Sequence, residues 1–133
     1  MSQNYNKVMT PGVLPPNLLH FTMSQNYNKV MTPGVLPQNL LYLKLGAMYD
    51  QVLLPNILPS SLTHFTIGHF YNQRFEKEVL PASLTWLTMG FEFNKKLLFL
   101  PSGLLHITFG ASFKQKQNFP QLTQIHKYLS EDK

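Results

Sequence analysis

A Leu-Pro pair recurs along most of this 133-residue chain at a nearly constant spacing. The pairs are separated by 22, 22, 22 and finally 20 residues: Leu14-Pro15, Leu36-Pro37, Leu58-Pro59, Leu80-Pro81 and Leu100-Pro101. A fixed period of roughly 20 to 29 residues is typical of solenoids, in which each repeat forms one coil and stacks on its neighbours. We therefore expect a stack of about five coils rather than a globule around one closed core.

Within each repeat, apolar side chains occupy the positions three, six and eight residues after the proline. The three sets are Leu18, Leu40, Leu62, Leu84 and Leu104; Phe21, Leu43, Phe65, Leu87 and Ile107; and Met23, Leu45, Ile67, Met89 and Phe109. The resulting pattern, L-x-x-L-x-L, is that of a leucine-rich repeat, in which one short strand per coil joins a parallel sheet. We expect these side chains to point inward and those between them to point outward.

A glycine follows four of the five predicted strands: Gly46, Gly68, Gly90 and Gly110, with Ser24 in the first repeat. We expect these glycines to supply the backbone freedom for a sharp corner. Three residues after each of these positions comes an aromatic residue, which in four repeats is followed by Asn or Asp. We expect the Asn or Asp side chain to bond to the backbone and to fix a second corner. These residues are Tyr27-Asn28, Tyr49-Asp50, Tyr71-Asn72, Phe93-Asn94 and Phe113. The predicted backs of the coils are Met31, Leu53, Phe75 and Leu97, then Val35, Ile57, Val79 and Phe99.

The segments L-P-S-S-L-T-H-F-T-I-G-H-F-Y-N (58–72) and L-P-A-S-L-T-W-L-T-M-G-F-E-F-N (80–94) resemble the FNIP repeat of social amoebae and giant DNA viruses. The resemblance covers residues 1–113 and departs at Ser24 and Asp50, where the family has glycine and asparagine. It implies a mostly β, right-handed, leucine-rich-like solenoid of about five coils of 20–22 residues, with one parallel strand in each. Long members of the family often carry an F-box before the repeats, which would make the repeats the substrate-recognition part of a ubiquitin-ligase adaptor. No such segment precedes the repeats here.

The two ends of the chain differ from the middle. Residues 1–15 recur unchanged at 23–37, so the chain begins inside a repeat and its first coil is expected to lack a strand. Three interpretations stay open: a fragment of a longer product, a coil covered by a partner, or self-association through this uncapped coil. Residues 114–133 are expected to form a cap, either a degenerate sixth strand or a short helix carrying Leu122, Ile125 and Leu129.

Composition and charge limit where the protein can reside and what kind of partner it can bind. The chain has no cysteine, no secretory signal and no apolar run of about 20 residues. We therefore expect a cytoplasmic protein (in the host cytoplasm if viral) that is neither secreted nor membrane-bound. The net charge is +5, but the basic residues are scattered and do not alternate with aromatics. That pattern argues against nucleic acid as the partner.

Outward-facing strand positions should form three rows on one face of the sheet. The middle row is His20, Tyr42, His64, Trp86 and His106; the next is Thr22, Lys44, Thr66, Thr88 and Thr108; the first is Leu19, Leu41, Thr63, Thr85 and Leu105. Parallel strands lie about 4.8 Å apart, so the rows should be continuous. Aromatic and imidazole groups are effective interface anchors. The candidate binding residues are His20, Tyr42, Lys44, His64, Thr66, Trp86, Thr88 and His106.

Neither catalysis nor a cofactor is expected. Histidines two coils apart lie about 9 to 10 Å from each other, too far to share a zinc ion that needs its ligand nitrogens at about 2 Å. The sequence offers no glycine-rich phosphate loop, no serine with a paired base and no paired carboxylates. The leading hypothesis is a non-catalytic protein–protein interaction module that uses the exposed sheet face. The alternatives are a truncated or decayed repeat protein without a ligand and a basic nucleic-acid binder.

Overall fold

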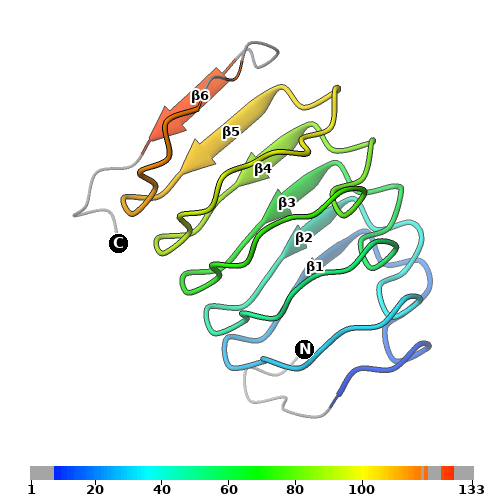
Figure 1. The fold of residues 1–133 in the computed structure, drawn as a ribbon. Coiled ribbons are helices and arrows are strands. Elements are labelled where there is room, and N and C mark those ends of the chain that lie inside the picture. The colour runs from blue at the N-terminus through cyan, green and yellow to red at the C-terminus, as the bar shows by residue number, and fades with distance from the viewer. Residues whose placement is uncertain (1–7, 118, 120–123, 128–133) are drawn as a thin grey trace.

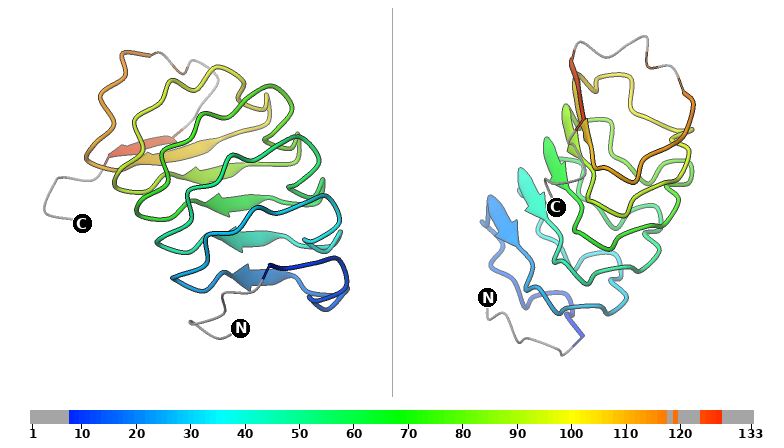
Figure 2. Two further views of the ribbon diagram at one scale, coloured as in Figure 1. Left: turned by 60° about the horizontal axis from the view of Figure 1, so that its bottom comes forward. Right: turned by 90° about the vertical axis from the view of Figure 1, so that its left-hand side faces the viewer.

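The computed structural model describes residues 8–117, 119 and 124–127, which contain one sheet of six parallel strands (Figure 1). The strands lie in chain order: β1 (His20–Thr22), β2 (Tyr42–Lys44), β3 (His64–Thr66), β4 (Trp86–Thr88), β5 (His106–Phe109) and β6 (Gln124–Lys127). The described residues form no helix. Irregular connections return along the opposite side, so the stack has a sheet on one side and the backs of the coils on the other (Figure 2). The predicted solenoid with one strand per coil is confirmed.

Successive strands pair at equivalent positions of the repeat. Phe21 of β1 lies opposite Leu43 of β2, and Leu43 lies opposite Phe65 of β3. The same register continues from Leu87 to Ile107, although that repeat is two residues shorter. In the first four strands the central residue is buried and its two neighbours are exposed or half-buried. The equal spacing of the sequence pattern therefore becomes an equal register of side chains.

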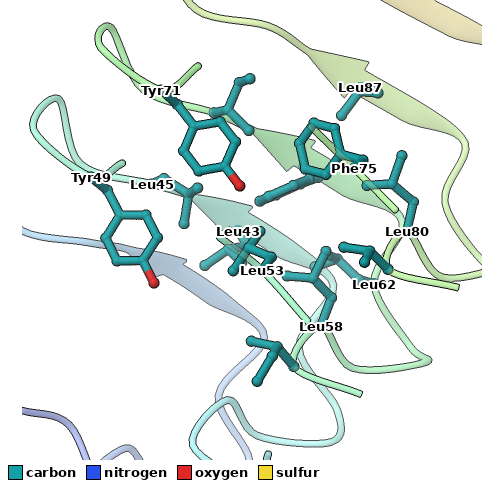
Figure 3. Packing of buried hydrophobic residues seen from close by; sticks show 14 of the residues in the cluster. Leu43, Leu45, Tyr49, Leu53, Leu58, Leu62, Tyr71, Phe75, Leu80 and Leu87 are labelled. Carbon is teal, nitrogen blue, oxygen red and sulfur yellow. The ribbon is translucent and has the colours of Figure 1, made fainter. Parts of the chain in front are cut away.

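The interior of the stack is filled by apolar side chains from every part of a coil (Figure 3). In the second coil, Leu43 of the strand, Tyr49 of the corner and Leu53 of the back are each at most 2% exposed. Burial confirms the predicted core at all but two positions. Leu18 is only partly buried, and Phe99 is exposed.

The corner glycines are needed for a reason other than the predicted one. Gly46, Gly68, Gly90 and Gly110 do not have a positive φ, so the expected requirement for unusual backbone freedom is wrong. Successive corners instead approach so closely that a Cβ atom added at Gly68 would collide with the carbonyl oxygen of Gly46. A hydrogen bond joins the same two corners, from the Phe70 N–H to the Ala47 carbonyl at 3.1 Å. Glycine is required because of this contact between coils.

The second corner is also bonded from coil to coil. The Oδ1 atom of Asn28 accepts a hydrogen bond from the Asp50 N–H, and Asp50 Oδ1 accepts one from the Asn72 N–H, both at 2.9 Å. Asn72 and Asn94 repeat the contact toward the following coil. The predicted bonding of these side chains to the backbone is confirmed, although it joins adjacent coils rather than closing one. Asp50 makes the same contact as asparagine does in the other coils, because both side chains supply an Oδ1 acceptor.

The backs of the first four described coils contain a tight turn that the prediction for the backs did not include. The N–H groups of Val13, Val35, Ile57 and Val79 each donate to the carbonyl three residues earlier. One residue in each turn has a left-handed backbone, with φ of 93°, 91°, 75° and 68° at Gly12, Gly34, Asn56 and Glu78. This conformation is costly for any residue with a side chain, and least so for asparagine.

The shortened repeat lacks this turn, and the prediction for Phe99 fails there. Phe99 was expected to close the back of the coil but is 41% exposed. The two missing residues fall between the buried Leu97 and the next Leu-Pro pair, where the other coils turn. Without the turn, the residue before the Leu-Pro pair is not buried as it is in the preceding coils, and Phe99 stays outside the core.

Strand β6 extends the sheet beyond the five predicted coils. Ile125 of β6 lies opposite the buried Ile107 of β5 and is itself 52% exposed. Residues 124–127 are thus a strand rather than part of a cap helix. Leu122 and Leu129, which were expected to lie on the same helical stripe, are outside the described residues. The division of the chain at residue 113 into repeats and cap stays a prediction.

Candidate functional site

The middle row of the sheet face is continuous across five strands. In register, His20 lies opposite Tyr42, Tyr42 opposite His64, His64 opposite Trp86, and Trp86 opposite His106. His20, Tyr42 and Trp86 are exposed, and the other two are half-buried. The structure therefore brings together all five members of the ring row, as we call this set.

The rings of the ring row stack on one another. Ring centroids are separated by 4.4 Å from His20 to Tyr42 and by 4.3 Å from Tyr42 to His64, with interplanar angles of 15° and 23°. The row continues at 5.7 Å from His64 to Trp86 and at 4.0 Å from Trp86 to His106. Each ring inside the row has its two faces against neighbouring rings. It therefore presents its edge, not its face, to solvent.

The inner nitrogen atoms of His64 and His106 differ in their surroundings. The Nδ1 atom of His64 lies 2.9 Å from the Thr63 hydroxyl. Partial burial, and secondarily the charge of His106, lower the pKa of His64. The Nδ1 atom of His106 is buried and has no hydrogen-bond partner among the described residues. In both rings Nε2, which lies farther from the backbone than Nδ1, is the nitrogen left for an outside partner.

The second row of the face differs from the prediction at one end. Thr22 and Lys44 are exposed, and Thr66 and Thr88 are half-buried. Thr108, expected to be an outward residue, is only 6% exposed and lies in the four-residue strand β5, which pairs with β6. The accessible part of the second row therefore ends at Thr88.

A shallow depression of about 150 Å³ lies on the face between the two rows. It is lined by side chains from three strands, including His20, Tyr42 and His64 of the ring row and Thr22, Lys44 and Thr66 of the second row. Sequence analysis identified these residues but neither the depression nor the edge-on rings. The stacking could have been predicted from the sequence. Strands about 4.8 Å apart leave too little room for neighbouring rings to lie flat on the sheet, so the rings must stand upright and stack.

The sheet face carries a positive charge but no negative charge. The fifteen outward positions of β1 to β5 include one lysine, Lys44, and no aspartate or glutamate. The acidic residues of the described segments lie elsewhere. Asp50 is in the second corner, Glu76 and Glu78 are in a back turn, and Glu92 is in a first corner. A partner at the sheet face would therefore meet hydrogen-bond donors and one positive charge, with no carboxylate to repel an anion.

The described segments show no arrangement typical of a metal centre. No group of three or more His, Cys, Asp or Glu side chains within them is placed to hold a metal ion. A helix of sufficient length and apolarity to cross a membrane is also absent from this part of the chain. The groups that the sheet face presents to solvent are ring edges, hydroxyls and one ammonium group.

A parallel stack with one strand per coil defines a leucine-rich-like solenoid. This chain belongs to the FNIP repeat family, since the FNIP Repeat model matches residues 5–48 and again 49–92. Among solved structures it is similar to CroV588, a giant-virus protein described as a novel circular LRR protein, with 38% identity and a TM-score of 0.85. The similarity covers 93% of this chain and 19% of CroV588, so the chain spans about a fifth of that protein's length. A search of curated proteins finds no match.

Proposed function

We propose that this chain is a non-catalytic protein-binding module and that the sheet face carrying the ring row is its binding surface. The observation that carries the proposal is the unbroken, in-register row of five exposed or half-buried rings. Such rings bury a large area on binding and lose little rotamer entropy. Solenoids of this kind commonly bind partners through extended faces built from equivalent positions of each repeat.

Affinity capture from cell lysate, followed by quantitative mass spectrometry, tests this proposal. The test variant combines Tyr42→Ala with Trp86→Ala, which removes the two largest side chains of the ring row. The control variant combines Val30→Ala with Val52→Ala, which truncates two valines that are 54% and 50% exposed and lie off the sheet face. We expect the wild type and the control variant to retain a partner that the test variant loses. Equal capture by all three folded proteins would contradict the proposal.

A second proposal concerns assembly. CroV588 is described as circular, and this chain matches about a fifth of it. We propose that the chain forms an arc that extends by edge-to-edge addition of further coils, supplied by a second copy or by a longer polypeptide. The earlier expectation of self-association through the first coil is one form of this proposal. Light scattering over a range of protein concentrations tests it, and a strictly monomeric chain would rule out addition by second copies.

A further inference from the structure

The ring row offers ring edges rather than stacking surfaces. Its inner rings use both faces against each other, at centroid separations of 4.0 to 5.7 Å. The edge of an aromatic ring carries the positive part of its quadrupole. The Tyr42 hydroxyl adds a hydrogen-bond donor. The Thr63 hydroxyl donates to the Leu41 carbonyl and therefore accepts from His64 Nδ1, so that His64 Nε2 is an acceptor. A partner that meets the positive ring edges and the Tyr42 hydroxyl must therefore supply acceptors.

The surroundings of the ring row favour negatively charged acceptors. Lys44 stands beside the row, and the depression of about 150 Å³ lies between Lys44 and the rings of Tyr42 and His64. The hydroxyls of Thr22 and Thr66 line the same depression. The face has no carboxylate that would repel an acidic group. Charge complementarity thus points to a partner that carries carboxylates.

We infer that the sheet face binds an extended, acidic segment of a protein partner, with carboxylates placed over the edges of the ring row and beside Lys44. The inference rests on the proposed protein-binding function and names the chemistry of its partner. Five strands at a spacing of about 4.8 Å give a row roughly 19 Å long, which an extended peptide covers with about six residues. A segment of that length could contact every strand from β1 to β5.

Single-stranded nucleic acid is the competing anion, and the ring geometry disfavours it. Proteins that bind single strands stack successive bases on exposed aromatic faces and neutralise phosphates with several cations. The inner rings have their faces occupied, and the face carries one lysine. A peptide needs neither feature, because its carboxylates and carbonyls can accept hydrogen bonds from ring edges.

Fluorescence anisotropy with labelled octaglutamate tests the inference on the full chain at low ionic strength. Octaglutamine is the neutral comparison peptide, and octathymidylate is the anionic nucleic acid. Lys44→Thr removes the positive charge of the face and installs the residue found in the other four repeats. Lys95→Gln is its matched control. It removes one positive charge in the second corner and installs the residue found there at positions 51 and 73. Thermal melting confirms that both variants fold.

We expect the wild type to bind octaglutamate more tightly than octaglutamine or octathymidylate. Lys44→Thr should weaken octaglutamate binding by about two- to fivefold, the effect of one exposed charge pair, whereas Lys95→Gln should leave it nearly unchanged. A further variant, Tyr42→Phe, keeps the stack but removes one donor and should also weaken binding. Equal losses in the two lysine variants would mean a general attraction to net charge and would overturn the inference.

Two other results would also overturn it: no octaglutamate binding, or tighter binding of octathymidylate through Lys44. These results leave the proposed function separately testable. If the ring-row double variant still loses a captured protein while octaglutamate fails to bind, the face binds a protein of other chemistry. If capture is unaffected as well, the proposed binding surface is itself wrong.

Discussion

Substituting alanine for Gly68 tests whether contact between coils, rather than backbone freedom, explains the corner glycines. The φ angle of Gly68 is one that alanine adopts readily, so backbone conformation alone predicts no loss of stability. The added Cβ, however, would collide with the Gly46 carbonyl oxygen and carbon and would press on the Cα of Ala47. These are backbone atoms in hydrogen-bonded corners, so no side chain can rotate away to relieve the contact.

The expected cost is about 3 kcal/mol, at the upper end of the range for an added methyl group in a tightly packed site. In a chain of this length such a loss lowers the melting temperature by about 10 °C. Circular dichroism during heating measures the shift, and urea unfolding gives the free energy independently.

Gly103→Ala is the matched control for this experiment. Gly103 also has an ordinary φ and is exposed, but a Cβ added there would lie 3.6 Å from the Ala82 carbonyl oxygen, an ordinary contact. The same chemical change should therefore be neutral or slightly stabilising, since alanine restricts the unfolded chain more than glycine. If Gly68→Ala melted like Gly103→Ala, the argument from close approach of the coils would be refuted.

The remaining predictions concern the core, the back turn and the buried tyrosines. Leu62→Ala should destabilise by about 2 to 5 kcal/mol in urea unfolding, because Leu62 is fully buried and the truncation leaves a cavity; wild-type stability would show that the assigned register is wrong. Glu78→Gly should stabilise by about 1 kcal/mol by relieving a left-handed residue, and Asn56→Gly by less, as judged from melting temperatures. Burial raises the pKa of Tyr49 and Tyr71, partly opposed by nearby backbone amides. Since their ionisation then favours the unfolded chain, stability should fall as the pH rises above about 10. Phenylalanine at both positions should reduce that fall in melts measured between pH 8 and 11, and an unchanged fall would contradict the assignment.

The fold could be predicted from the sequence because each coil repeats one pattern of inward side chains. The positions of Leu62, Phe65 and Ile67 relative to the proline indicated both the strand and its buried side. An equal offset between repeats then required equal register between strands, which the pairing of Phe65 with Leu87 confirms. In a solenoid each coil contacts only its neighbours, so this local information is sufficient.

The back turn was not recognised, although three of its four copies carry a turn signal. Pro11-Gly12, Pro33-Gly34 and Pro55-Asn56 each place a proline before a residue that tolerates a left-handed backbone, and only Lys77-Glu78 departs from this pattern. The core of the coils holds the turn in place, so tertiary packing overrides the preference of the glutamate. The error at Phe99 has the same origin, since the loss of a turn that had not been recognised could not be taken into account.

The candidate site was predicted as a set of residues but not as a surface. The register placed His64 between Tyr42 and Trp86 correctly. What the side chains offer to a partner depends on ring orientation, on the depression beside Lys44 and on the burial of Thr108. These are properties of packed neighbours.

The shortened repeat shows that the sheet face and the backs of the coils vary independently. Loss of two residues removes the back turn and exposes Phe99, yet Trp86 still pairs with His106, and their rings stack at 4.0 Å. The corners at either end of the strand isolate it from the change, because backbone hydrogen bonds such as that from Ser112 to Phe91 still join neighbouring coils. A change in length on the back therefore leaves the ring row continuous. The sheet face is the part of this solenoid whose geometry is kept from coil to coil, and for that reason we propose that binding occurs there rather than at the backs.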